Sequence, residues 1–180
     1  DVSSFALDNA TAIGNGAIVD ASNKVRIGNS AVTVIEGQVP FTTPSDGRYK
    51  FNIQENVKGL DFILHLRPVT YQFDTKRFDA QWNSGTTKQN YAIQTAYDEA
   101  SRIRRTGFIA QEVEQAATKA GYDFSGLIKP KTEQDHYSLS YDAFVVPLVK
   151  AVQEQQQQIA DLQQQLKEMK KIIATLQHNN

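Results

Sequence analysis

A heptad repeat near the C-terminus restricts the fold of this chain more than any other feature. Its apolar residues recur in alternating steps of three and four, and Gln155 is the one polar residue among them. This pattern predicts a coiled-coil helix over residues 141–180, about 50 Å long at ~1.5 Å per residue. Pro147 lies near its start, so we expect the helix to begin or to kink there. The residues expected to face a partner are Val152, Ile159, Leu162, Leu166, Met169, Ile173 and Leu176.

The other positions of this helix are mostly Gln, Lys or Glu, so an isolated helix would expose an apolar stripe to water. Such a stripe requires a partner, and the simplest partner is another copy of the chain. The alternative is that the stripe folds back onto its own domain. The heptad residues do not fix the number of chains, because Ile, Val and Leu are mixed at the core positions.

The first forty residues contain a short repeat. The heptapeptide at residues 12–18, Ala-Ile-Gly-Asn-Gly-Ala-Ile, is followed fourteen residues later by Arg-Ile-Gly-Asn-Ser-Ala-Val at residues 26–32. Gly and Asn tolerate positive φ, and a short fixed period predicts stacked β coils in a β-roll-like segment over residues 1–38. A coincidental pair of β-hairpins is the alternative. The repeat resembles the Ala-Ile-Gly-x-x-Ala head repeats of trimeric autotransporter adhesins, whose β-rolls are built from three chains.

The middle of the chain is predicted to be α+β. Residues 39–44 are rich in Pro and Thr, which favours an extended connector. Helical spacing of apolar residues from Val57 to Leu64 ends before Pro68. Alternating apolar residues then predict a strand over residues 69–73.

The region after this strand has less regular patterning. Residues 74–105 are mostly polar and are interpreted as an insertion, with a helix around residues 91–101. Phe108 and Ile109 are expected to form a short strand. Val113, Ala116, Ala117 and Ala120 share one helical face, and Gly121 is suited to the position after that helix.

Composition excludes several classes of protein. The 19 Lys and Arg residues balance 20 Asp and Glu residues, which argues against a dedicated binder of nucleic acid or anionic membranes. There is no cysteine, and the three histidines lie far apart, so we expect neither a metal site nor a cofactor. No apolar run reaches the ~18 residues of a membrane span. The chain begins at Asp1 without a signal peptide, and we expect it to be the C-terminal part of a longer protein.

A motif of six residues, Ser-Asp-Gly-Arg-Tyr-Lys at 45–50, directly follows the connector. Asn52-Ile53 and Gly59-Leu60 come next, and further blocks follow in order at residues 66–71, 106–114 and 137–141. Together they resemble the opening motif Ser-Asp-x-Arg-x-Lys and the later blocks of the intramolecular chaperone domain of phage tail spikes and fibres. This is the self-cleaving domain typified by endosialidase tail spikes, peptidase family S74. The resemblance extends from Ser45 to the C-terminus.

In that family the serine and the lysine form a self-cleaving dyad. The resemblance therefore implies that Ser45 is the nucleophile, that Lys50 is the base and that the bond between Pro44 and Ser45 is cut. Asp46 and Arg48 are expected to support the turn. A serine hydroxyl needs a base, and a lysine can serve only where burial or a neighbouring cation lowers its pKa.

Geometry adds one requirement to this chemistry. An extended chain would hold Ser45 and Lys50 far apart, so the chain must turn at Asp46-Gly47. The alternative is purely structural: Ser45 and Asp46 cap the following segment, while Arg48 and Lys50 are solvated or ion-paired.

The resemblance implies an intertwined homotrimer in which residues 45–140 are the chaperone domain. Its partners would be its own copies and the upstream fibre or adhesin region of the same chain, outside the cell on a bacterial surface or a phage tail. Cleavage would be a single-turnover event.

The alternative is a permanent, non-cleaving trimerisation cap of a cell-surface adhesin. A hydrolase of external substrates is a third hypothesis, but neither a triad nor a pocket motif supports it. The family also includes self-cleaving membrane-tethered transcription factors. No part of this sequence resembles their DNA-binding domain.

Overall fold

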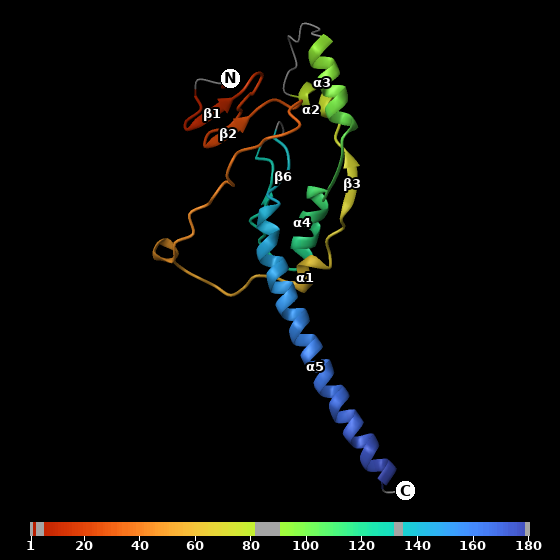
Figure 1. Ribbon diagram of the computed structural model, residues 1–180. Coiled ribbons are helices and arrows are strands. Elements are labelled where there is room, and N and C mark those ends of the chain that lie inside the picture. Colours follow the sequence, from red (N-terminus) through yellow and green to blue (C-terminus); the bar gives the residue numbers. More distant parts are fainter. Residues whose placement is uncertain (1, 3–5, 82–90, 132–134, 179–180) are drawn as a thin grey trace. The chain divides into compact units, whose positions relative to one another are not determined.

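The computed structural model describes residues 2, 6–81, 91–131 and 135–178 of the chain. It has mixed helices and small two-stranded sheets, followed by one long C-terminal helix, in agreement with the predicted α+β class (Figure 1). The chain divides into two compact units. The first contains residues 1–46 and 70–107, and the second contains residues 47–69 and 108–180.

The N-terminal repeat of the first unit forms two short strands, β1 (Ala10–Ile13) and β2 (Lys24–Ile27). They pair in parallel with a shift of one repeat, so that Ala10 lies opposite Lys24 and Ile13 lies opposite Ile27. A β-hairpin joins antiparallel strands, so this pairing differs from the hairpin alternative.

The turns of the repeat are stacked in the same register as its strands. Asn9 and Asn23 both have positive φ, 51° and 57°, and the Asn9 side-chain amide donates to Oδ1 of Asn23 at 2.9 Å. Gly14 and Gly28 also both have positive φ, which glycine adopts without the strain of a Cβ atom. The Gly28 N–H donates to the Ile13 carbonyl at 2.8 Å. At the Asn and Gly positions on either side of the strands, the two repeats therefore share the same left-handed backbone conformation.

The remainder of the first unit contains strand β3 (Val69–Gln72) next to β4 (Arg104–Gly107), and helices α2 (Thr75–Ala80) and α3 (Tyr91–Arg102). The predicted strand at residues 69–73 and the predicted helix at residues 91–101 are confirmed. The strand predicted at Phe108–Ile109 is wrong by a few residues, because it ends at Gly107 and Ile109 is already the N-cap of the next helix. Residues 82–90 of the predicted insertion lie outside the described residues.

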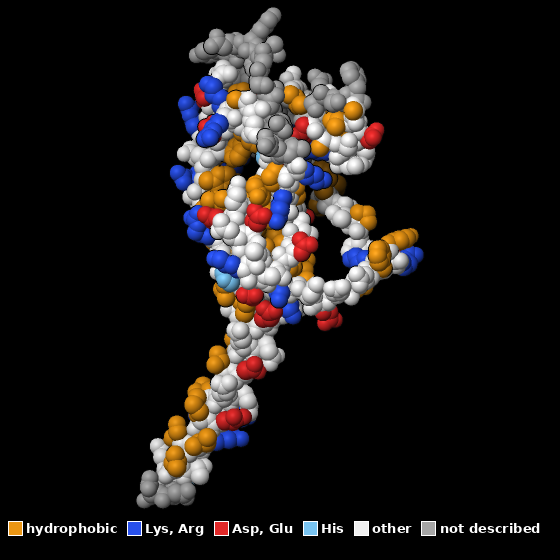
Figure 2. Space-filling model, turned by 180° about the vertical axis from the view of Figure 1, so that it is seen from behind, with side chains coloured by type: hydrophobic (Ala, Val, Ile, Leu, Met, Phe, Trp, Pro, Cys, Tyr) orange, Lys and Arg blue, Asp and Glu red, His pale blue; other side chains and the backbone are white. Residues whose placement is uncertain are grey.

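Helix α5 (Val145–His178) dominates the second unit and spans 34 residues. A short 3-10 helix, η2 (Asp142–Phe144), precedes it, and Pro147 is the third residue of α5. The helix therefore begins near the proline, where the missing N–H costs nothing. Every residue from Gln155 to His178 is exposed, so the apolar stripe is not folded back onto this unit. Figure 2 shows hydrophobic side chains along the exposed length of this helix.

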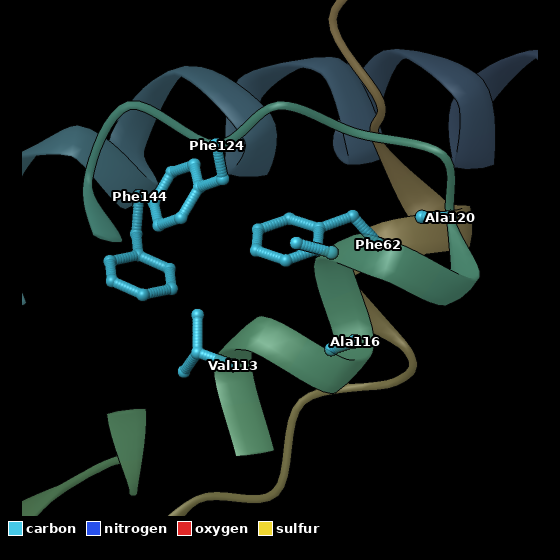
Figure 3. Close-up of a cluster of buried hydrophobic side chains, with 7 residues drawn as sticks. Phe62, Val113, Ala116, Ala120, Phe124 and Phe144 are labelled. Atoms are coloured by element: carbon cyan, nitrogen blue, oxygen red, sulfur yellow. The ribbon is translucent and has the colours of Figure 1, made fainter. Parts of the chain in front are cut away.

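The core of the second unit lies among α1 (Leu60–Ile63), α4 (Ala110–Lys119) and η2, the short helix directly before α5. Phe62 is fully buried. Its ring centroid lies 5.0 Å from that of Phe124, and the centroids of Phe124 and Phe144 are 4.6 Å apart (Figure 3). The helical face predicted for α4 is buried against these rings, and Gly121 follows the helix with a φ of 58°. A small antiparallel pair, β5 (Leu127–Ile128) and β6 (Ser138–Leu139), completes the unit.

Gly59 is required where α1 approaches α5. A Cβ atom on Gly59 would lie 2.7 Å from the Ala151 nitrogen and 2.8 Å from the Lys150 carbonyl carbon. Both are backbone atoms, which cannot rotate away. The Leu60 N–H donates to Oε2 of Glu154 at 2.8 Å, so the first turn of α1 is also capped by α5.

We expect Gly59→Ala to lower the free energy of unfolding by about 1–3 kcal/mol, the usual cost of forcing an extra methyl into packed backbone. Thermal unfolding followed by circular dichroism measures this. Gly47→Ala is the matched control, because a Cβ atom on Gly47 meets nothing within 4 Å. Equal melting temperatures for the two variants would show that the close approach of α1 to α5 is not needed.

Candidate functional site

The Ser-Asp-Gly-Arg-Tyr-Lys motif lies where the chain makes a single 3-10 turn, η1 (Gly47–Tyr49). The Lys50 N–H donates to the Gly47 carbonyl at 3.2 Å and closes this turn. The chain therefore turns directly after Asp46, as the Asp-Gly dipeptide predicted. The chain rises by about 2 Å per residue in a 3-10 turn and by ~3.3 Å per residue in a strand. The two ends of the motif are therefore closer together than they would be in an extended chain.

The segment that carries the motif is exposed throughout. Every residue from Val32 to Asn56 is exposed, including Pro44, Ser45 and Lys50. Its apolar side chains share this exposure: Phe51 is 91% and Tyr49 80% accessible. The Arg48 guanidinium lies over the Tyr49 ring, 5.7 Å from its centroid. The two members of the predicted dyad, Ser45 and Lys50, are therefore both exposed in the single chain.

The later sequence blocks, in contrast, contact one another within the second unit. Arg67 forms a two-pronged ion pair with Glu112, in which Nε donates to Oε2 at 3.1 Å and Nη2 donates to Oε1. The hydrogen bond to Glu112 raises the pKa of Arg67. The Phe108 N–H donates to the Tyr141 hydroxyl at 3.0 Å, and the two rings are stacked. These contacts join the blocks to one another beside the core of the second unit.

Glu114 links α4 to the chain that follows it. Its carboxylate accepts from Tyr137 Oη at 2.8 Å and pairs with Lys129 Nζ at 2.7 Å. The hydrogen bond from Lys129, and then that from Tyr137, lowers the pKa of Glu114. These partners were not predicted from the sequence, because Lys129 and Tyr137 both lie well beyond the helix that carries Glu114.

A depressed carboxyl pKa gives a definite direction for stability against pH. The unfolded glutamate titrates near ~4.3, so the stabilisation by Glu114 is present above that pH and is lost as pH falls through its lower folded pKa. We expect Glu114→Gln to lower the melting temperature near neutral pH and to reduce the loss of stability on acidification below about pH 4. Melting curves over this range measure the effect, with Glu55→Gln on the exposed segment as the control. A Glu114→Gln variant with the unaltered acid sensitivity would contradict it.

The seven residues predicted to form the trimer seam all lie on α5 and are all exposed in the single chain. Ile159, the least exposed of them, is still 42% accessible. The structure thus presents two uncovered apolar surfaces, the α5 stripe and the segment around the motif. Sequence patterning found the first, and the exposure of Tyr49 and Phe51 had no counterpart in any periodicity.

The described residues contain neither a cluster of metal ligands nor a helix that could span a membrane. No group of three or more His, Asp or Glu side chains there is placed to hold a metal ion. Among the helices of the described ranges, none combines the length and the apolar character that crossing a bilayer requires.

Comparison with protein families gave one match. The model of the family described as chaperone of endosialidase matches residues 45–122, which begins at the predicted nucleophile and ends just after α4. This confirms the prediction of an intramolecular chaperone domain in this part of the chain. The block at residues 137–141 and helix α5 lie beyond the matched range. Comparisons with curated proteins and with solved structures gave no significant match.

Proposed function

We propose, from the family match over residues 45–122, that this chain is an intramolecular chaperone. It holds three copies together through α5 and thereby promotes folding of the region that precedes it in the same chain. The observation that carries the proposal is the continuous apolar stripe on α5, exposed from Val152 to Leu176 directly after a domain of the chaperone family. An exposed stripe of this length on a soluble helix is explained by association with identical helices.

The benefit to the preceding region is entropic. A fibre built from three chains has many non-local pairings, and its chains must meet before any pairing is rewarded. Joining three C-termini raises the effective concentration of the three N-terminal segments. Within one chain, β1 and β2 already pair across a whole repeat, so this segment is held by contacts between residues 14 positions apart.

We further propose that the assembled protein cuts itself once, between Pro44 and Ser45. Ser45 Oγ attacks the carbonyl carbon of Pro44 while the neutral Lys50 amine takes its proton. The C–N bond breaks as the Lys50 ammonium returns this proton to the Ser45 nitrogen, which leaves as an amine, and an ester between the Pro44 acyl group and Oγ remains. Water, deprotonated by Lys50, hydrolyses this ester, so that Ser45 becomes the new N-terminus. Neighbouring copies would have to supply the burial that the single chain does not give to Lys50.

The second candidate function is a permanent trimerisation cap with an inactive dyad. The exposure of the whole segment from Val32 to Asn56 favours it, since a water-filled setting does not activate a lysine. Both functions place the chain outside the cell, at the end of a phage tail fibre or a bacterial surface adhesin. Both have the same partners, namely two further copies and the upstream part of the same chain.

One experiment separates these functions. Light scattering gives the mass of the native assembly, and mass spectrometry under denaturing conditions gives the mass of each chain. A native mass of three chains with cut polypeptides supports the self-cleaving chaperone, and three uncut chains support the permanent cap. A native mass of one chain contradicts both.

A further inference from the structure

The fourteen-residue repeat of the first unit continues beyond its second copy. One further repeat after Ser22, Asn23 and Lys24 falls on Glu36, Gly37 and Gln38. A step of fourteen residues from Val25, Arg26 and Ile27 likewise leads to Val39, Pro40 and Phe41. The third copy therefore keeps apolar residues at the two positions where β2 has Val25 and Ile27.

The third copy also has a residue that can adopt the backbone conformation of the repeat. The position before each strand has positive φ, occupied by Asn9 at 51° and Asn23 at 57°. The third copy has Gly37 there, and glycine enters the left-handed region most easily. The ten residues between Ile27 and Gln38 match the ten between Ile13 and Lys24, so the connection has the length that already closes one turn of the stack.

The edge that would receive a third strand is open. In the part of the chain that the structure describes, β2 pairs with β1 on one side, and its order in the sheet leaves the other side unpaired. The matching segment is equally uncovered, with Val39 76% and Phe41 90% accessible. An exposed strand edge and an exposed apolar segment with the same register are complementary surfaces.

Side-chain packing would follow from this register. Phe41 would extend the column formed by Ile13 and Ile27, because residues opposite each other in a parallel pair point to the same face. Ile27 lines an open groove of about 420 Å³ in the first unit, together with Phe73 and Phe78. Phe41 would therefore move from water to the wall of a groove that contains Ile27, Phe73 and Phe78 among its lining residues.

We propose that residues 36–41 form a third rung, pairing in parallel with the open edge of β2 of their own chain in the native assembly. This replaces a passive connector by the last turn of the β-stack, which ends just before the Ser45 motif. The third rung is weaker than the first two. Its residue Pro40 is equivalent to Arg26 but has no backbone N–H to donate to a neighbouring strand. It ends at Phe41, since Thr42 replaces Gly14 and Gly28 and a β-branched residue resists positive φ.

The test uses the full chain, whose lack of cysteine gives a clean background. In the double variant Val25→Cys/Val39→Cys the two thiols would lie on opposed residues, within the distance that a disulfide spans. Mild oxidation of the native assembly should then form a disulfide within one chain, seen as loss of free thiol and as a single-chain band without reductant. The control pair Val25→Cys/Phe41→Cys is diagonal in this register and should stay mostly reduced, and single-cysteine variants report links between copies.

A second pair of variants tests the backbone requirement. In the single chain Gly37 does not have positive φ, so that conformation tolerates any residue there. The third rung instead predicts that Gly37→Asn retains disulfide formation in the Val25→Cys/Val39→Cys background and that Gly37→Val abolishes it. Equal disulfide yield for the opposed and diagonal pairs, a disulfide that joins two chains, or unaffected linkage in Gly37→Val would overturn the proposal. Light scattering on the same samples keeps this result separate from that on trimerisation.

Discussion

Replacing Ile159 with aspartate should dissociate the assembly or unfold it. Ile159 occupies the middle of the α5 stripe, with apolar residues seven positions before and after it. Burying an aliphatic side chain contributes ~1.5–3 kcal/mol relative to exposure, and a trimer gains this once per chain in every layer. The substitution removes that gain and places three carboxylates around one axis, where their mutual repulsion and desolvation oppose association.

Ala160→Asp is the matched control, because it introduces the same residue at the next position of the helix, outside the heptad stripe. Its side chain faces water in the assembly and costs only helix propensity, about 0.7 kcal/mol or less. Light scattering of the two variants should give an intact assembly for Ala160→Asp and single chains or aggregates for Ile159→Asp. An Ile159→Asp protein that keeps the native mass would place the interface elsewhere.

The sequence predicted best those parts of the fold whose information is local and periodic. The alternation of apolar residues located α5, and the small residues from Val113 to Ala120 located the buried face of α4. Two helix ends were also predictable. Pro147 suits the first turn of α5, and Gly121 suits the left-handed position after α4. In these cases a few neighbouring residues determine the structure.

Contacts between distant residues were not predictable in this way. Nothing near Gly59 in the sequence shows that the backbone of Lys150 and Ala151 lies against it. Arg67 and Glu112 are 45 residues apart, and their ion pair exists only because the core brings α1 and α4 together. A single sequence lists the charges but does not state their partners.

The candidate site likewise has one feature that the local sequence determines and one that it does not. The turn at Asp46-Gly47 was predictable, because it depends on two adjacent residues. The exposure of Ser45 and Lys50 was not predictable in this way, because no local pattern distinguishes an exposed segment from a buried one here. The family match identifies the domain that begins with the motif, and the proposed chemistry of the motif would depend on surroundings that the single chain does not provide.

Ser45→Ala and Lys50→Arg should each abolish self-cleavage without preventing assembly. The first removes the hydroxyl that attacks the Pro44 carbonyl. The second replaces the amine with a guanidinium, which stays protonated at any workable pH and cannot accept the serine proton. Neither residue lies in the α5 stripe, so both variants should have the native mass of the unaltered protein. Thr43→Ala and Lys58→Arg are matched controls, since each makes a similar change outside the motif.

The order of events gives a sharper test of the same mechanism. If neighbouring copies supply the burial that Lys50 needs, denatured protein should stay uncut and cleavage should begin only after refolding. Its rate should be independent of protein concentration once trimers have formed, because the attacked carbonyl belongs to the residue before the nucleophile. Mass spectrometry of timed samples should then find one cut, with Ser45 as the new N-terminus. Cut product in Lys50→Arg would remove the lysine from the mechanism. An unaltered assembly that stays intact after prolonged incubation would identify the permanent cap, because the same trimer would then carry the motif without using it.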